Sequence, residues 1–344
     1  MEETAKKILI VDDSRYMRQY LRELFESDQR FRVIGDAEDT YEAVKMMAVE
    51  APDAITLDIE MPRMSGLTFL KKIMRQHPLP VVIITSQEIK QIEWAMEALR
   101  AGAVEVVSKK DITPNEKEGR QDLLNKMWAA ANGHVSRYSP RDVKESYQNK
   151  EVVEKTVSEH IIMIGASSGG TRVLTDIITG LPAGIPPIIV VQHISEQMSF
   201  LFARQLNIAC PFYVKEAEGG DPVVSNQVLI APGNKHMEIK KGDAGFSIRL
   251  TQGPPLNHVR PSVDKLFFSA LSYDVTKMTA ILLTGMGRDG AQGLLQLKEK
   301  GAYTIAQDEK SSVIYGMPRA AKELGAAKAI MNPDAIRQYI SALR

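Results

Sequence analysis

Acidic side chains gather in the first third of this sequence at places where apolar runs end. Asp12 and Asp13 follow the run at residues 7–11, and Asp58 follows the run at residues 54–57. Carboxylates that lie together repel one another unless a cation joins them, and their oxygens suit Mg²⁺, which takes its other ligands from water or phosphate. If the two runs are strands of one parallel sheet, these residues predict a magnesium-dependent site for a phosphoryl group, with Asp58 as its acceptor.

A hydroxyl group and a cation can reach the same site. Thr85 ends a further apolar run and Lys109 follows another, so a parallel sheet would bring both to the edge where the three carboxylates lie. Acids at strand ends are often only solvated loop residues, and each of these side chains taken singly fits that interpretation. All five together, at the ends of four strands, favour a phosphorylation site.

The second reactive group lies on a glycine-rich turn after the apolar run at residues 161–164. Gly165 to Thr171 has the spacing of a phosphate-binding loop, but Thr171 stands where that loop needs its lysine. A dinucleotide fingerprint would need a glycine in place of Ser167. The turn also matches G-x-S-x-G, which places Ser167 beside a helix N-terminus whose N–H groups favour developing negative charge. A structural turn with an N-cap serine remains the alternative.

A serine nucleophile needs a base and a group that orients that base. His193 directly follows an apolar run, which places it at the sheet edge where Ser167 lies. His236 and His258 are weaker candidates, because the first precedes a predicted hairpin and the second lies in a proline-rich loop. Asp289 follows a third strand end. The three side chains would then come from three strand ends on one face, as acyl transfer requires.

Glycines flank a candidate oxyanion donor close to Asp289. Gly285 and Gly287 allow close approach of the backbone, which would expose the N–H of Met286 to a developing oxyanion. The chain order serine, histidine, aspartate differs from that of the α/β-hydrolases, so that fold is not assigned. A histidine-only metal site is disfavoured, because the histidines lack paired ligand spacing.

The elements that must position these groups alternate between strand and helix patterns in two blocks. Residues 1–131 contain five strand–helix units, which predict a parallel sheet with helices on both faces. Residues 132–159 lose apolar periodicity and are interpreted as a linker. Residues 160–344 contain six further apolar runs, four helix patterns and a β-hairpin. The predicted fold class is therefore α/β, with two doubly wound parallel-sheet domains. The expected strands are residues 7–11, 31–34, 54–57, 81–84 and 104–107, then 161–164, 188–192, 212–217, 227–230, 279–283 and 303–306.

Length and composition limit the possible functions. A chain of 344 residues favours two domains, and 43 basic residues against 43 acidic ones argue against general nucleic-acid binding. The single cysteine, Cys210, excludes an internal disulfide and a cysteine zinc cluster. The longest apolar runs are far shorter than a bilayer-spanning helix, and the N-terminus lacks the apolar core of a signal peptide. These features are typical of a cytoplasmic protein.

The first block resembles a response-regulator receiver domain over residues 7–131. The resemblance implies a flavodoxin-like fold with Asp58 as phosphoacceptor and a chemotaxis histidine kinase as phosphodonor. It further implies Mg²⁺ ligation by Asp13, Asp58 and the Glu60 carbonyl with Asp12 nearby, a switch hydroxyl at Thr85 and a phosphate-contacting cation at Lys109.

Three positions depart from the receiver pattern. Val106 stands where many receivers carry an aromatic switch residue, so the usual coupling between Thr85 and an aromatic ring is unavailable. Lys110 replaces the usual proline after the lysine, and Ser65 replaces a common aspartate. The pocket is intact, but its state must be transmitted in another way.

The second block resembles the CheB family of chemotaxis protein-glutamate methylesterases. The matching motifs are Gly165-Ala-Ser-Ser-Gly-Gly, Val191-Gln-His193, Ala231-Pro-Gly-Asn-Lys-His-Met237, Arg260-Pro-Ser-Val-Asp264, Leu283-Thr-Gly-Met-Gly-Arg-Asp-Gly290, Ala306-Gln-Asp-Glu309 and Gly316-Met-Pro318. The resemblance implies a Rossmann-like domain in which Ser167, His193 and Asp289 are catalytic. It also implies an oxyanion hole from Met286 and Ser168, and no cofactor for the ester hydrolysis.

The two resemblances together imply a phosphorylation-activated serine hydrolase. Its substrates would be glutamate methyl esters, and also glutamines, on methylated chemoreceptors, so the protein would meet membranes only through those receptors. The receiver would inhibit the catalytic domain until Asp58 is phosphorylated. The alternative is a non-enzymatic, phosphorylation-dependent module that binds a nucleotide or a partner. A DNA-binding response regulator is disfavoured by the neutral charge.

Overall fold

The computed structural model describes residues 4–61, 64–86, 89–135 and 160–343. The chain divides into two compact units, residues 1–140 and 141–344. Most of the predicted linker, residues 132–159, lies outside the described residues, so its limits remain a prediction.

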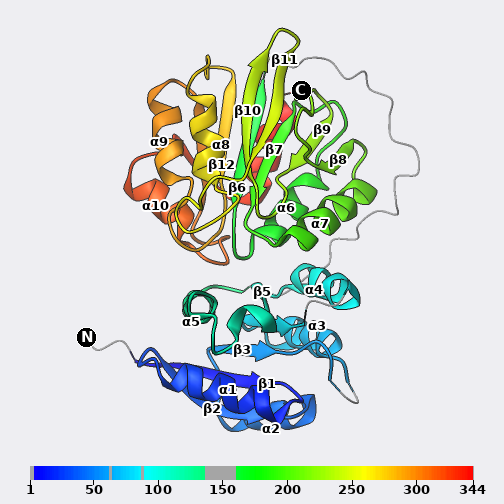
Figure 1. Cartoon of the computed structure of the whole chain (residues 1–344), viewed down its shortest axis with the longest axis vertical. Coiled ribbons are helices and arrows are strands. Elements are labelled where there is room, and N and C mark those ends of the chain that lie inside the picture. The colour runs from blue at the N-terminus through cyan, green and yellow to red at the C-terminus, as the bar shows by residue number, and fades with distance from the viewer. Residues whose placement is uncertain (1–3, 62–63, 87–88, 136–159, 344) are drawn as a thin grey trace. The chain divides into compact units, whose positions relative to one another are not determined.

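The first unit contains a parallel five-stranded sheet in the order β2-β1-β3-β4-β5, with helices on both faces (Figure 1). From the boundary between β1 and β3, successive strands are added in opposite directions. This boundary is the topological switch point, where such sheets bind ligands. The strands are β1 (Lys6–Val11), β2 (Phe31–Ala37), β3 (Ala54–Leu57), β4 (Val81–Thr85) and β5 (Glu105–Ser108). The helices are α1 (Arg15–Glu26), α2 (Thr40–Val49), α3 (Gly66–Gln76), α4 (Ile89–Ala101) and α5 (Lys117–Ala131), with a 3₁₀ turn, η1 (Lys109–Ile112).

Short side chains allow helices to begin directly after the acidic loops. Ser14 and Ser65 each accept a main-chain N–H from the first turn of the helix that follows, α1 and α3 respectively. A Cβ on Gly66 would lie 1.9 Å from the carbonyl oxygen of Asp58. Only glycine therefore lets α3 start against the loop that carries Asp58.

The second unit contains a parallel seven-stranded sheet in the order β14-β13-β12-β6-β7-β9-β8 and a separate antiparallel hairpin. The sheet strands are β6 (Ile161–Ala166), β7 (Ile188–Gln192), β8 (Tyr213–Glu216), β9 (Gln227–Ile230), β12 (Met278–Leu282), β13 (Tyr303–Gln307) and β14 (Ala329–Met331); the hairpin is β10 (His236–Gly242) with β11 (Gly245–Thr251). The helices are α6 (Gly170–Ile178), α7 (Glu196–Ala209), α8 (Val263–Ala270), α9 (Ala291–Glu299), α10 (Met317–Glu323) and α11 (Pro333–Ala342).

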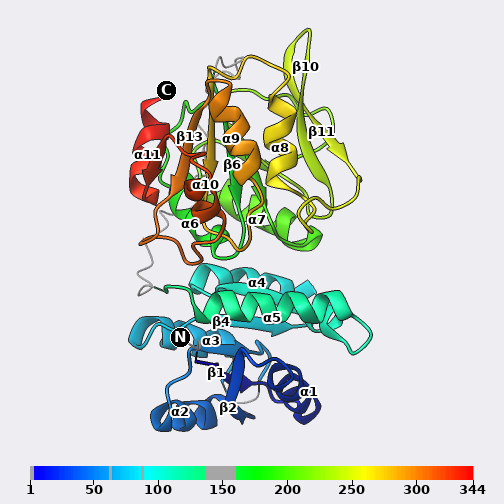
Figure 2. The same cartoon turned by 90° about the vertical axis from the view of Figure 1, so that its left-hand side faces the viewer.

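One apolar core joins the sheet, the hairpin and helices α8, α9 and α10. Helix α8 lies between α9 and the hairpin in both views (Figures 1 and 2). It can pack this closely on β6 because position 165 is a glycine: a Cβ there would lie 2.3 Å from Cγ1 of Val263. This close packing fixes the N-terminus of α8 beside the carboxyl ends of β6 and β12.

The predicted fold class is confirmed: both sheets are parallel, wound in both directions and covered by helices. The sequence prediction missed β14, α10 and α11. Strand β14 has only three residues, and α10 has seven, so neither is long enough to show a clear period. Among the described residues, no helix combines the length and the apolarity needed to span a bilayer.

Candidate active site and phosphorylation site

Ser167 lies on a tight turn between β6 and α6. Its N–H donates to the carbonyl of Thr284 at 3.0 Å, and its carbonyl accepts the N–H of Gly170 at 2.7 Å. The N-cap of α6 is Gly169, with φ +75°, and no side chain caps this helix. The N-cap of α6 is thus not a serine, and the Ser167 hydroxyl does not cap this helix.

His193 lies beside Ser167 because their strands are paired. Ala166 and Gln192 are the last partners in the β6–β7 register, so the next residue on each strand is Ser167 and His193. The N–H of His193 donates to the carbonyl of Ala166 at 3.1 Å. The Gln192 amide nitrogen donates to the carbonyls of both neighbours, Ser167 at 2.9 Å and His193 at 3.3 Å. One buried amide thus holds the two loops together.

Asp289 orients the imidazole. Its Oδ2 lies 3.0 Å from Nε2 of His193, and the carboxylate is almost fully buried. Burial alone would raise the pKa of the Asp289 carboxyl, but hydrogen bonds from His193, Asn257 and Ser262 hold that pKa below its usual value. Asp289 therefore stays ionised and can stabilise a proton on the ring.

The contact with Asp289 assigns a role to each ring nitrogen. Because Nε2 faces the carboxylate, Nδ1 is the nitrogen left to act on a substrate or on Ser167. Within the described part of the chain, the Ser167 hydroxyl makes no hydrogen bond to the ring. Such bonds are often long in the free enzyme and tighten when substrate binds.

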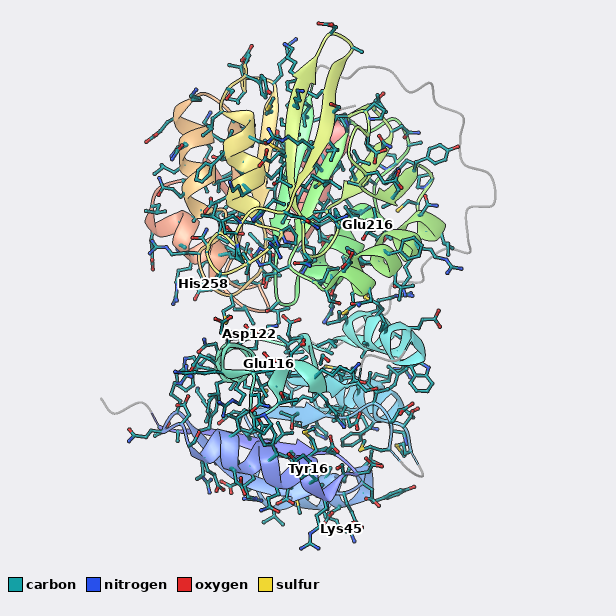
Figure 3. The ribbon with its side chains drawn as sticks, in the orientation of Figure 1. Tyr16, Lys45, Glu116, Asp122, Glu216 and His258 are labelled. Carbon is teal, nitrogen blue, oxygen red and sulfur yellow. The ribbon has the colours of Figure 1, made fainter. Side chains whose placement is uncertain are left out.

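The other histidines have different surroundings. His236 is fully buried; its Nε2 donates to the carbonyl of Pro254 at 3.0 Å, and its Nδ1 accepts the N–H of Ser262 at 3.2 Å. Both of its nitrogens are thus occupied by main-chain partners. His258 is exposed on the loop before α8 (Figure 3). Only His193 combines proximity to Ser167 with a carboxylate partner.

The candidate oxyanion donors lie next to Ser167. A Cβ on Gly285 would be 2.6 Å from Cβ of Ser167, so the backbone that carries Met286 touches the serine. In the part of the chain that the structure describes, the N–H of Met286 has no acceptor. Ser168 is buried, and its carbonyl accepts the Thr284 hydroxyl at 3.1 Å. The Met286 N–H is thus available to a developing oxyanion.

Gly285→Ala is expected to lower esterase activity by about 100-fold, because the new Cβ would displace Ser167 or the Met286 N–H by an ångström or more. Gly219→Ala is the matched control: nothing lies within 4 Å of that Cβ position. Initial rates of the two variants, with thermal unfolding to check the fold, test this. Equal rates would show that the close approach at Gly285 has no part in catalysis.

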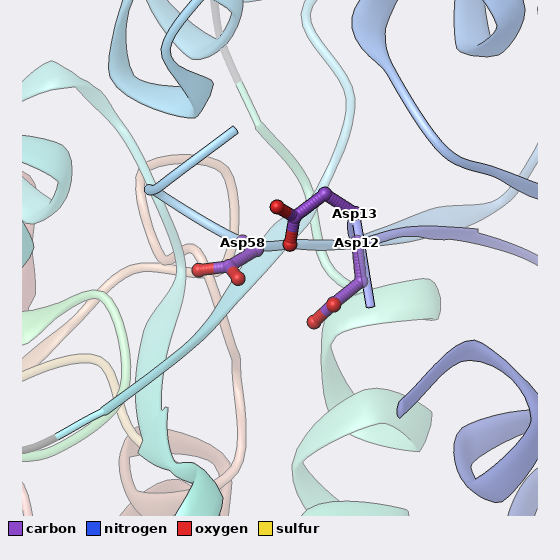
Figure 4. A group of neighbouring side chains, drawn as sticks. All are labelled: Asp12, Asp13 and Asp58. Carbon is purple, nitrogen blue, oxygen red and sulfur yellow. The ribbon is translucent and has the colours of Figure 1, made fainter. Parts of the chain in front are cut away.

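Three carboxylates converge at the switch point of the first sheet (Figure 4). Ligand oxygens of Asp12, Asp13 and Asp58 lie within 4.8 Å of one another, at the ends of the paired strands β1 and β3. Lys109 joins two of them, with Nζ 2.8 Å from Oδ2 of Asp12 and 2.6 Å from Oδ2 of Asp58. Thr85 pairs with Ser108 across β4 and β5, so it is adjacent to Lys109.

Burial and ion pairing shift the pKa values of the charged groups at this site in opposite directions. Burial raises the pKa of both Asp12 and Asp58, although Lys109 opposes the rise. Burial would lower the pKa of Lys109, but its two ion pairs raise it instead. Clustered carboxylate oxygens that carry excess negative charge are the donor set that Mg²⁺ prefers, so the residues fit that ion. The main-chain N–H of Glu60 donates to Oδ1 of Asp58 at 3.3 Å, which places Glu60 at the rim of the site.

Sequence reasoning missed the residues that support Asp289. Ser262 and Asn257 donate to its Oδ1 at 2.7 and 2.8 Å, and the N–H of Val263 donates to its Oδ2 at 2.6 Å. Gln192, which bridges the Ser167 and His193 loops, was also missed. Ser262 and Gln192 lie inside the quoted motifs, but Asn257 lies outside them. Nothing in the local sequence identifies the distant partner of any of these side chains.

Comparison with protein families gives two matches. A family model described as CheB methylesterase matches residues 162–340, and one described as response regulator receiver domain matches residues 8–116.

Individual relatives cover almost the whole chain. The protein named protein-glutamate methylesterase/protein-glutamine glutaminase 5 of Anaeromyxobacter dehalogenans is 43% identical, covering 96% of this chain and 94% of its own. A protein of the same name, numbered 2, from Rhodospirillum rubrum is also 43% identical, covering 94% of each chain. The crystal structure of the Thermotoga maritima CheB methylesterase catalytic domain is 36% identical, with a TM-score of 0.53, and covers 55% of this chain and all of its own.

Proposed function

The chain belongs to the CheB methylesterase family and carries a response-regulator receiver domain, and we propose that Ser167, His193 and Asp289 are the catalytic triad with which it hydrolyses glutamate methyl esters on chemoreceptors. The single observation on which the triad rests is the 3.0 Å contact between His193 and Asp289, beside a serine on the neighbouring paired strand. The enzyme works in the cytoplasm and meets the membrane only through its receptor substrates.

Acylation begins when Oγ of Ser167 attacks the ester carbonyl carbon and Nδ1 of His193 takes the hydroxyl proton. The negative charge on the carbonyl oxygen is stabilised by the N–H of Met286, with help from Ser168 and the N-terminus of α6. Collapse of this intermediate breaks the bond to the methoxy group, and His193 returns the proton so that methanol leaves. Asp289 keeps its negative charge and stabilises the imidazolium.

Deacylation uses the same groups in reverse order. His193 takes a proton from water, the hydroxide attacks the acyl carbon, and Ser167 leaves with the proton that His193 returns. The products are a free glutamate side chain and the original enzyme. The same steps convert a glutamine amide to glutamate, with ammonia as the leaving group.

The receiver controls this activity through Asp58. Asp58 accepts a phosphoryl group from the chemotaxis histidine kinase, and Lys109 and Thr85 contact its oxygens. Asp13, Asp58 and the Glu60 carbonyl, with Asp12 nearby, would hold Mg²⁺, which would supply positive charge next to the phosphoryl oxygens. Without the phosphoryl group, the receiver inhibits the esterase.

Acetyl phosphate with Mg²⁺ is expected to raise methanol release from methylated receptor membranes at least several-fold, and Asp58→Asn to abolish that rise. Asp28→Asn is the matched control, because Asp28 pairs with Arg30 before β2, at the edge of the sheet opposite to the cluster. Methanol is measured by gas chromatography. Stimulation of Asp58→Asn to the wild-type level would contradict the assignment of the phosphoacceptor.

Deletion of residues 1–140 tests the inhibitory role of the receiver separately. The remaining chain is expected to release methanol faster than the unphosphorylated full-length protein, because the inhibiting unit is absent. If the two rates are equal, the receiver does not inhibit the esterase.

A further inference from the structure

A single amide lies between two buried carboxylates next to the triad. The Nδ2 group of Asn257 donates to Oδ1 of Asp289 at 2.8 Å and to Oδ2 of Asp264 at 2.8 Å. Asn257 itself is exposed, whereas both aspartates are almost fully buried. The amide therefore covers the carboxylate pair from the solvent side. Its orientation is fixed, because the amide oxygen could accept nothing from either carboxylate.

Each carboxylate is also held by the start of a helix. Asp289 accepts the N–H groups of Val263 at 2.6 Å and Asp264 at 3.3 Å, which are the first two residues of α8. Asp264 in turn accepts the N–H of Gly293, in the first turn of α9, at 2.7 Å. The two acids are thus fixed in place by rigid elements and cannot move apart to relieve their repulsion.

When two carboxylates are buried close together, the charge of one favours proton uptake by the other. Burial raises the pKa of Asp264, and the charge of Asp289 adds to that rise. The groups that oppose proton uptake are the donors to the pair. His193 faces Oδ2 of Asp289, and Ser262, itself held by the buried His236, faces Oδ1. Asn257 is the one side chain among these described partners that donates to both acids.

We propose that Asn257 is a positioning residue, whose amide bridges Asp264 and Asp289 so that both stay ionised and a full negative charge remains on Asp289 to support His193. The loop is built to hold the amide there. Asn257 and His258 have φ of +54° and +66°, two successive left-handed residues that are not glycine. Such backbone is unfavourable and is retained where it positions a functional group.

This inference rests on the proposed function, and Asn257→Ala in the full-length, acetyl phosphate-activated protein tests it. The expected kcat for methanol release falls about 10-fold at pH 7 while KM changes less than about two-fold, because the substrate contacts remain. Loss of the donor lets the acid pair take up a proton more readily. The acidic limb of the kcat profile is therefore expected to move up by about one pH unit.

A second substitution separates this role from damage to the loop. Asp264→Asn removes one of the two acids, so in Asn257→Ala/Asp264→Asn no neighbouring negative charge favours proton uptake by Asp289. The double variant is expected to regain most of the lost kcat and the wild-type acidic limb. In Asp264→Asn alone, the NH₂ group of the new amide meets the NH₂ group of Asn257. This variant is expected to be less active than wild type, with the acidic limb of its kcat profile unshifted.

Asn234→Ala is the matched control for a change in loop structure. Asn234 is also exposed, also has a positive φ (+61°), and uses its side chain to hold Arg260 on the same loop. It donates to neither carboxylate, so its loss is expected to leave the acidic limb unchanged.

The inference would be overturned if the acidic limb of the kcat profile does not move in Asn257→Ala or moves equally in Asn234→Ala. It would also be overturned if the double variant does not recover kcat. Each of these results leaves the proposed esterase intact if Ser167→Ala is inactive. Activity in Ser167→Ala would instead overturn the proposed function itself.

Discussion

Ser167→Ala is expected to lower the rate of methanol release by a factor on the order of 10⁴ to 10⁶, the range found when the nucleophile is removed from serine triads. The hydroxyl is the attacking group, so without it no acyl-enzyme can form. The turn should survive, because its main-chain bonds to Thr284 and Gly170 do not use the side chain. The loss is therefore expected in kcat with little change in the midpoint of thermal unfolding.

Two measurements make the assignment specific. A fluorophosphonate probe is expected to label the wild-type protein at Ser167, as read by mass spectrometry of the digested chain, and to leave Ser167→Ala unlabelled. Ser247→Ala, on the hairpin strand β11, is the control and is expected to keep the wild-type rate, because among the described residues its hydroxyl donates to the carbonyl of Lys240 on the neighbouring strand. Methanol release by Ser167→Ala at the wild-type rate would remove the serine mechanism.

Except for the three-residue β14, the strands of both sheets could be predicted from the sequence, because buried parallel strands are short apolar runs with little ambiguity. The predictions at residues 54–57, 188–192 and 227–230 agree with β3, β7 and β9 at both ends. The sequence also predicted that reactive residues at strand ends would meet, since parallel strands place their carboxyl ends at one edge. His193 directly follows β7, and it contacts Asp289, which lies farther along the loop after β12.

The support around Asp289 could not be predicted in the same way. Asn257 and Ser262 reach the carboxylate only because α8 packs against β6, and that packing depends on the absent side chain at Gly165. A hydrogen bond between residues 32 apart leaves no periodic signal. Local patterns therefore identify the reactive groups, whereas the partners that tune them depend on the assembled core.

Asp289→Asn is expected to lower kcat by about 10⁴, or about 5.5 kcal/mol of transition-state stabilisation. The first cause is loss of the negative charge that stabilises the protonated His193. The second is the direction of the new amide. If its NH₂ replaces Oδ2, it meets Nε2 of His193 and the N–H of Val263; the ring must then turn Nε2 into an acceptor, which puts the proton on Nδ1. A protonated Nδ1 cannot accept the Ser167 proton.

The opposite orientation of the amide is no better. If the NH₂ replaces Oδ1, it faces the Asn257 amide and the N–H of Asp264, which are both donors. Either way a buried donor is left unpaired, so the free energy of unfolding is expected to fall by about 1–3 kcal/mol.

The pH dependence separates this stability effect from the catalytic one. The native pKa of Asp289 is below its usual value, so its ionised form stabilises the wild-type fold above the unfolded pKa, and that contribution is lost as the pH falls through the native pKa. The midpoint temperatures of unfolding of wild type and Asp289→Asn are therefore expected to differ most at neutral pH and to become equal in acid. The loss of kcat, by contrast, is expected at neutral pH even at temperatures where both proteins are folded. A variant that keeps wild-type kcat under those conditions would show that the carboxylate only stabilises the fold, and the triad would then reduce to serine and histidine.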